Sequence, residues 1–197
     1  MEIDKLQLEH KNQLELQQKQ FENLSRGLVA VPGENGTLVS WRFLGTDSNS
    51  LTYNLYCSGE KLNDKPITTT NFFHTGASKN AEYTLKEVEN GEETGVEYTT
   101  TAWDKNYIGF KVTEREGSNI DDGAVADLDG DGEYEILLRR VPSMDVNTRT
   151  SYPVIEAYKT DGTHMWTIDI GPNEINEVDI NFLAYDMDGD GKAEVIM

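Results

Sequence analysis

The sequence is poor in cysteine and in basic residues, and it contains no long apolar run. Its one cysteine, Cys57, excludes a disulfide within the chain, and no zinc-binding pattern surrounds it. Lysine and arginine together number 17 against 36 aspartates and glutamates, which gives a formal net charge of −19. Because binding to nucleic-acid phosphates needs a basic surface, this balance argues against a nucleic-acid partner.

The absence of a long apolar segment bears on membranes and on export. No stretch approaches the roughly 20 apolar residues of a membrane-spanning helix, so we expect no membrane partner. The first 20 residues are polar and lack the apolar segment of a secretory signal peptide. We therefore expect a cytoplasmic location for the chain as written, or secretion if a leader has been removed, and we expect a monomer.

An acidic stretch that occurs twice dominates the rest of the sequence. The first copy, residues 126–138, reads ADLDGDGEYEILL, and the second, residues 185–197, reads YDMDGDGKAEVIM. Their first aspartates, Asp127 and Asp186, lie 59 residues apart. Each copy has carboxylates at positions 1, 3, 5 and 9 of a loop and glycines at positions 4 and 6, where the backbone can turn at positive φ.

This spacing is typical of a cation site. Three alternate aspartates and a final glutamate, with a main-chain carbonyl at position 7, supply about six oxygen ligands, which suits Ca²⁺. Without an ion, two unit charges ~4 Å apart repel by roughly 4 kcal/mol at an effective dielectric of ~20. We therefore predict Ca²⁺ as a cofactor. The expected ligands are Asp127, Asp129, Asp131, Glu133 and Glu135 in the first loop, and Asp186, Asp188, Asp190, Lys192 and Glu194 in the second, with Glu133 and Lys192 contributing carbonyls.

Two other interpretations of the loops were weighed. An EF-hand loop begins in the same way but needs a glutamate at position 12 and helices on both sides. Position 12 is Leu138 in one copy and Met197 in the other, and the short apolar flanks indicate buried strands. A solvated acidic turn is the second alternative, and the repetition of the glycine and glutamate positions disfavours it.

Three regions follow one another along the chain. Residues 1–24 are rich in good helix formers and contain neither glycine nor proline, so we predict an N-terminal helix. An extension packed on the next domain is favoured over a coiled-coil arm or a frayed tail. Residues 25–113 contain short alternating strands, expected at 27–31, 37–43, 51–57, 67–74, 83–88 and 96–102. The last two flank Asn90-Gly91, a strong hairpin signal.

This middle region predicts an all-β sandwich. Its aromatic residues could form either a core or a platform for sugars, and the alternation favours a core; they are Trp41, Tyr53, Tyr83 and Trp103. A connection over 104–120 is expected to hold one more alternating strand at Ile108, Phe110 and Val112.

Residues 114–197 predict part of a β-propeller. Strands are expected at 124–126, 134–140, 153–158, 165–170 and 181–185, and four strands followed by a restart is the period of one blade. The loop at 141–152 accounts for the long repeat. The chain stops inside the second repeat, so we expect a fragment of a longer protein or an incomplete gene model.

Several separate motifs carry a family resemblance: RGLVAV at 26–31, VSWRFLGTD at 39–47, YNLY at 53–56, AYKTDGT at 157–163 and WTID at 166–169. With the acidic loops, they make the chain resemble the N-terminal part of a rhamnogalacturonan lyase of polysaccharide lyase family eleven. The resemblance implies a fibronectin-III-like sandwich, followed by the first blade and the start of the second blade of an eight-bladed, calcium-binding propeller.

The resemblance also implies a reaction and a partner, the rhamnogalacturonan backbone of pectin, which the full-length protein would cleave by β-elimination. In that chemistry a cation or basic residues neutralise the uronate carboxylate, a base removes the neighbouring C–H proton, and the C4 oxygen leaves. The calcium loops would hold the corners of blades.

The chain departs from the family pattern at two places. Residues 138–142 read LRRVP where a Lys-Trp pair is expected, and residues 179–181 read DIN where a His-Tyr pair is expected. We therefore nominate no catalytic and no substrate-binding residue and expect this fragment to be inactive alone. Arg140 is expected to pair with the loop carboxylates, with a uronate contact as the alternative, and His164 to lie on the surface.

Two other functional hypotheses stay open. The chain could be a calcium-stabilised module that binds a carbohydrate or a protein without catalysis, which the sandwich and the acidic surface would allow. It could also be a truncated product without a function.

Overall fold

The computed structural model describes residues 23–77, 79–142, 152–171 and 181–197. Within these ranges the regular secondary structure consists of β-strands, and no helix is present that could span a membrane. The predicted all-β class is therefore confirmed for the part of the chain that the structure describes. The helix predicted over 1–24 lies, except for its last two residues, outside that part.

Backbone contacts divide the chain into two compact units, one of them Ser25–Ile108 and the other containing Gly109–Met197. The division falls earlier than the boundary predicted between residues 113 and 114. The reason is that the segment after Ile108 packs on the second unit. The ring of Phe110 lies 5.6 Å from that of Tyr158, and the backbone N–H of Thr113 donates to the Tyr158 hydroxyl at 3.0 Å.

Because of these contacts, the alternating strand predicted at Ile108, Phe110 and Val112 does not form. Residues 102–115 contain no strand in the structure. The apolar side chain of Phe110 is held by Tyr158 and by the turn at Gly162, instead of by a neighbouring strand.

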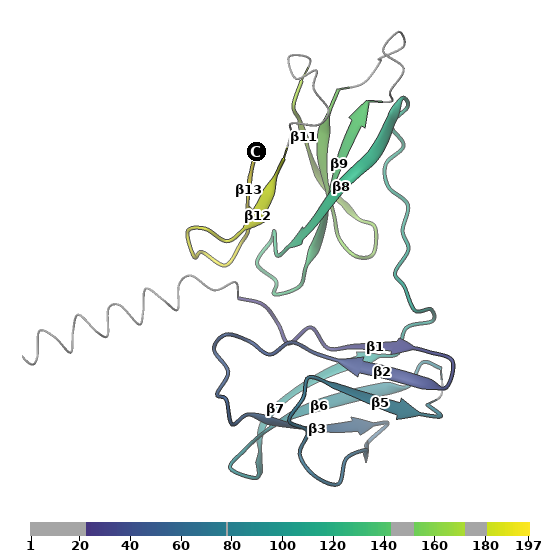
Figure 1. Ribbon diagram of the computed structural model, residues 1–197, viewed down its shortest axis with the longest axis vertical. Helices are drawn as coiled ribbons and strands as arrows, with labels where there is room; N and C mark the ends of the chain where they lie inside the picture. The colour runs from purple at the N-terminus through teal and green to yellow at the C-terminus, as the bar shows by residue number, and fades with distance from the viewer. Residues whose placement is uncertain (1–22, 78, 143–151, 172–180) are drawn as a thin grey trace, which may run out of the picture. The chain divides into compact units, whose positions relative to one another are not determined.

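The first unit contains seven antiparallel strands in two sheets (Figure 1). The three-stranded sheet has the order β1 (Val29–Pro32), β2 (Gly36–Ser40), β5 (Asn71–Thr75). The four-stranded sheet has the order β4 (Glu60–Lys61), β3 (Thr52–Cys57), β6 (Glu82–Glu89), β7 (Glu92–Thr101). Six of these strands match the predicted segments, and the two-residue β4 was not predicted.

One buried cluster draws side chains from both sheets, including Ala30 and Val39 from the first and Leu55 and Leu85 from the second. The two sheets therefore enclose a common core, as the strand pattern predicted. Three of the four aromatic residues expected there are buried, namely Trp41, Tyr53 and Tyr83, whereas Trp103 is half-buried. Cys57 ends β3 and is half-buried.

A charged network is also buried in the first unit. The Arg26 guanidinium, whose side chain is 3% exposed, donates to Asp47 Oδ1 at 3.0 Å and forms an ion pair with Glu87. It also contacts the hydroxyl of Tyr53 at 3.3 Å. Because a buried charge is costly without partners, this arginine and its two carboxylates depend on one another.

The second unit is built on an antiparallel meander. Its strands stand side by side in sequence order: β8 (Ser118–Ala126), β9 (Glu135–Pro142), β10 (Val154–Tyr158) and β11 (His164–Asp169). A separate antiparallel pair follows, β12 (Leu183–Tyr185) and β13 (Glu194–Ile196). Leu137, Ile155 and Ala157 are fully buried, and Ala184 and Val195 of the pair pack against them. The predicted strands of this region are confirmed, while most of the loop predicted at 141–152 lies outside the described residues.

Candidate metal centres

Both acidic loops join two neighbouring antiparallel strands. The first loop, residues 127–134, connects β8 to β9, and the second, residues 186–193, connects β12 to β13. The first aspartate directly follows the incoming strand in each loop, and the glutamate is the first residue of the outgoing strand. This placement holds the two ends of the ligand set on regular structure and leaves the middle to the glycine-rich turn.

The first aspartate of each loop is held by backbone N–H groups. Asp127 accepts hydrogen bonds from Gly130 N at 2.7 Å and from Gly132 N at 2.9 Å. Asp186 accepts from Gly189 N and Gly191 N at the same two distances. Both aspartates are buried, with 1% and 2% of their surface exposed. Their carboxylates are therefore fixed in position by the turn itself.

The remaining carboxylates repeat this correspondence. Glu135 Oε2 accepts from Leu128 N at 2.8 Å, and Glu194 Oε2 accepts from Met187 N at 2.9 Å. The aspartates at position 5 each accept from the N–H two residues later at 2.9 Å, in the pairs Asp131–Glu133 and Asp190–Lys192. The two loops thus share one backbone geometry, as their matching sequences predicted.

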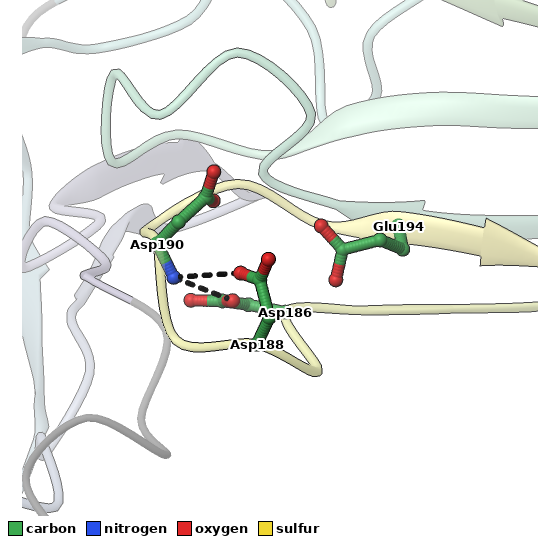
Figure 2. A group of neighbouring side chains, drawn as sticks. All are labelled: Asp186, Asp188, Asp190 and Glu194. Carbon is green, nitrogen blue, oxygen red and sulfur yellow. Dashed lines mark hydrogen bonds between the residues drawn. The ribbon is translucent and has the colours of Figure 1, made fainter.

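The structure brings most of the predicted ligands together. In the second loop, Asp186, Asp188, Asp190 and Glu194 each offer an oxygen, and these oxygens all lie within 4.8 Å of one another. Figure 2 shows that the four side chains come from one loop and the start of β13, with the Asp190 N–H bonded to two of the carboxylates. In the first loop, Asp127, Asp129 and Glu135 form the corresponding group. The carbonyl ligands expected at Glu133 and Lys192 stay predictions.

A basic side chain lies among the carboxylates of the first loop. Lys159 Nζ is 2.6 Å from Asp129 Oδ2, 3.3 Å from Asp131 Oδ2 and 3.8 Å from Glu135 Oε1. Hydrogen bonds to Asp129 and Asp131 raise the pKa of Lys159, and the same contact lowers the pKa of Asp129. Burial, with the charges of Asp129 and Asp131 adding to it, raises the pKa of Glu135.

These donor sets fit a divalent cation. They consist of carboxylate oxygens, the ligands that Ca²⁺ prefers, and in the first loop the ammonium of Lys159 lies where positive charge is needed. The raised pKa of Glu135 shows the cost of gathering carboxylates there without a second positive charge. The residues present could therefore hold a calcium ion in each loop.

The two loops also contact each other. The backbone N–H of Ala193, in the second loop, donates to the carbonyl of Asp127 at 2.7 Å. Gly130 has φ of +82°, and a Cβ at this position would lie 3.2 Å from Lys192 Cγ. Only glycine combines this backbone conformation with such a close neighbour.

Arg140 does not pair with the loop carboxylates, so that prediction is wrong. Its side chain donates to Glu156 Oε2 at 3.2 Å and to the carbonyl of Thr113 at 2.6 Å. The reason is the strand register, which places Arg140 opposite Val154, toward the end of β9 farthest from the loop. Glu156 is fully buried and also accepts from the Tyr158 hydroxyl at 2.9 Å.

His164 is exposed, as predicted. Its Nε2 lies 2.8 Å from the Thr167 hydroxyl, and its ring contacts Tyr158 edge to face. Lys159 is the functional residue that the sequence reasoning missed. The pairing of Tyr158 with Ile136 places the next residue of the chain beside Glu135, so the strand register is the signal that would have found it.

Comparison with known proteins places the chain in a family. Residues 19–103 match the family model described as the rhamnogalacturonan I lyases beta-sheet domain, and residues 110–197 match the rhamnogalacturonan lyase family 11, C-terminal domain. The chain therefore belongs to the family 11 rhamnogalacturonan lyases, as the sequence motifs indicated.

Individual relatives agree with this assignment. The rhamnogalacturonan endolyase YesW of Bacillus subtilis (strain 168) is 39% identical over 194 residues, covering 91% of this chain and 31% of the relative. The rhamnogalacturonan exolyase YesX of the same organism is 37% identical over 195 residues, covering 91% and 32%. The chain thus spans about a third of the length of these relatives.

Solved structures give the same result. The exotype rhamnogalacturonan lyase YesX superposes with a TM-score of 0.80 at 37% identity, over 89% of this chain and 32% of that one. The Bacillus licheniformis rhamnogalacturonan lyase PL11 superposes with a TM-score of 0.73 at 38% identity, over 89% and 33%.

Proposed function

We propose that this chain is the N-terminal part of a rhamnogalacturonan lyase that cleaves the pectin backbone by calcium-dependent β-elimination. The observation that carries the proposal is that the two family matches fall on the two compact units, one match to each. The relatives named as endolyase and exolyase both act on rhamnogalacturonan, so the substrate class follows while the mode of cleavage stays open.

The proposed architecture is a fibronectin-III-like sandwich followed by the first blade and the start of the second blade of a propeller. The two sheets of the first unit, with strand orders β1-β2-β5 and β4-β3-β6-β7, support the first part. A four-stranded meander followed by a new antiparallel pair supports the second, because each propeller blade is a four-stranded sheet.

The proposed role of the acidic loops is structural. Bound calcium would neutralise the carboxylates gathered in each loop. Asp127 and Asp186 already accept two backbone N–H bonds each, so these buried aspartates tie the ion site to the turn. With four carboxylates and one carbonyl committed in each loop, little coordination is left for a uronate.

We further propose that the chain is inactive by itself. β-Elimination needs a base at the C–H bond and positive charge at the uronate. Among the described residues of the second unit, Arg139 pairs with Asp121, Arg140 with Glu156 and Lys159 with the first loop. None of these basic side chains stands ready to act on a substrate.

A chimera tests the lyase proposal. In it, this chain would replace the matching segment of the endolyase YesW, and the ultraviolet absorbance of the unsaturated uronate would be followed on rhamnogalacturonan with calcium and then with chelator. We expect a calcium-dependent rise from the chimera and none from the isolated chain. A folded chimera without activity would contradict the proposal, and activity of the isolated chain would contradict its inactivity.

A binding module without catalysis is the second candidate. Exposed aromatic side chains on the first unit favour it, since Phe43 and Phe73 are each 50% exposed. Aromatic rings at a surface can stack on sugars or pack on a protein partner. Calorimetric titration with rhamnogalacturonan oligosaccharides would show binding that Phe43→Ala or Phe73→Ala weakens, and absence of binding would remove the carbohydrate form of this candidate.

A further inference from the structure

We infer that Lys159 is a tethered cation that competes with calcium for the first loop, so that the two loops of this chain bind calcium with unequal affinity. The inference rests on the proposed calcium function of the loops. It adds a residue outside the acidic motif that sets the affinity of one of them.

The position of the ammonium carries the argument. Lys159 Nζ approaches the carboxylates at positions 3, 5 and 9 of the first loop, at 2.6, 3.3 and 3.8 Å. These are three of the four carboxylates nominated as calcium ligands. A calcium ion and an ammonium could not both occupy this space, because two positive charges so close would repel strongly. Calcium binding to the first loop therefore requires Lys159 to leave.

The fold holds Lys159 at this place by its backbone. Its N–H donates to the Thr163 carbonyl at 2.9 Å, and its own carbonyl accepts from Gly162 N at 2.9 Å, which fixes it in the turn between β10 and β11. Its side chain is 36% exposed. The ammonium can therefore swing into water at little cost, so Lys159 lowers the calcium affinity of the loop without blocking it.

The second loop gives the internal comparison. Among the residues that the structure describes, no lysine or arginine forms an ion pair with Asp186, Asp188, Asp190 or Glu194. Asp190 at position 5 converges with the other three carboxylates there, whereas its counterpart Asp131 is outside the first group and contacts Lys159. The two loops share a backbone geometry but differ in how much of their negative charge is already neutralised.

The inference has a consequence for the order of filling. At limiting calcium the second loop would fill first, while the first loop would stay held by Lys159. The first loop would then be partly neutralised in the absence of metal, and the second would depend on the ion alone.

Calorimetric calcium titration of the whole chain tests this. The second loop is disabled with Asp188→Asn and Asp190→Asn, so that the first is measured alone, and Lys159 is then changed to Met. We expect calcium binding at the first loop to tighten by about tenfold, the order expected from the loss of exposed ion pairs acting together. Lys159→Gln serves as a second neutral variant, and Lys159→Arg, which keeps the charge, should stay close to the parent.

Two controls separate the possible outcomes. Lys111→Met removes the same charge from an exposed site in the same unit and should leave the affinity unchanged. With the first loop disabled by Asp129→Asn and Asp131→Asn, Lys159→Met should not change binding at the second loop. An unchanged or weakened affinity at the first loop in Lys159→Met and Lys159→Gln would overturn the inference alone. An absence of calcium binding at both loops would overturn the calcium proposal and the inference with it.

Discussion

The two units of the chain are stabilised in different ways. In the first unit, two sheets cover a common apolar core that contains Tyr53, Leu55, Tyr83 and Leu85, all at most 1% exposed. In the second, the fully buried apolar cluster is reduced to Leu137, Ile155 and Ala157, and the strand connections carry the acidic loops. Burial of apolar surface stabilises the first unit at any calcium concentration, whereas the proposed ions neutralise the charge of the second.

The exposed apolar side chains follow the same division. Val125 next to the first loop and Leu183 in β12 are 55% and 57% exposed, and Tyr185, Met187 and Ile196 around the second loop are each more than 40% exposed. The pair β12–β13 thus presents much of its apolar surface to solvent. Its stability depends correspondingly more on the loop between the two strands.

The largest expected effect is in the first unit. Arg26→Met would leave Asp47 and Glu87 without their buried partner and should lower the free energy of unfolding of this unit by about 4 kcal/mol. Denaturant unfolding, followed by the fluorescence of the buried Trp41, measures it. Lys61→Met on the exposed β4 is the control and should change little. An equal loss of stability in the second unit would show that the two units are not independent.

Chelation should act on the second unit alone. If calcium is present at about 100 times its dissociation constant, removing it should cost about 3 kcal/mol for each occupied loop. Calorimetric melting with calcium, with chelator and with magnesium at equal ionic strength would separate the two transitions. Asp186→Asn should reproduce part of the loss. Melting of the first unit that moves with chelator as much as that of the second would remove the contrast.

A hydroxyl in the second unit should have a smaller effect. Tyr158→Phe removes a donor to the fully buried Glu156 and an acceptor for the Thr113 N–H, and should cost about 2 kcal/mol. The loss should be equal with and without calcium, because neither contact involves a loop. Tyr152→Phe at a 49% exposed site is the matched control. A loss that calcium abolishes would mean that the network and the loops are coupled.

The smallest effect is on pH dependence. The pKa of Glu135 is raised, so without calcium its contribution to stability is greatest at low pH and is lost as the pH rises from 4.5 through the raised pKa. Calcium needs the ionised carboxylate, so with the ion bound the slope should reverse. Urea unfolding between pH 4 and 7, with calcium and with chelator, measures both slopes. Equal slopes would show that Glu135 is not a ligand.

Much of the fold could be predicted because its signals are local. Asn90 and Gly91 have φ of 53° and 86°, the conformation that a two-residue hairpin between β6 and β7 requires. The acidic loops have the geometry expected from their spacing because glycines and aspartate side chains satisfy the turn from within. Each of these features depends on residues that are neighbours in the sequence.

The features that could not be predicted depend on contacts between distant residues. Lys159 meets the first loop, and Arg140 meets Glu156, only through the register of β9 against β10. The expected strand around Phe110 failed because Tyr158, 48 residues later, provides a contact that no alternation reveals. The metal ligands were therefore visible in the sequence, whereas the residue that would compete with the metal was not.

The hydrogen bond between Ala193 and Asp127 has a consequence for folding kinetics. It joins residues that lie 66 positions apart, with the four-stranded meander formed by the chain between and around them. Closing so long a loop costs entropy that local turns do not incur, and contacts of this kind slow folding. The hairpin of β12 and β13 should therefore dock late, on a first loop that is already shaped, so the order of loop assembly follows the order of the chain.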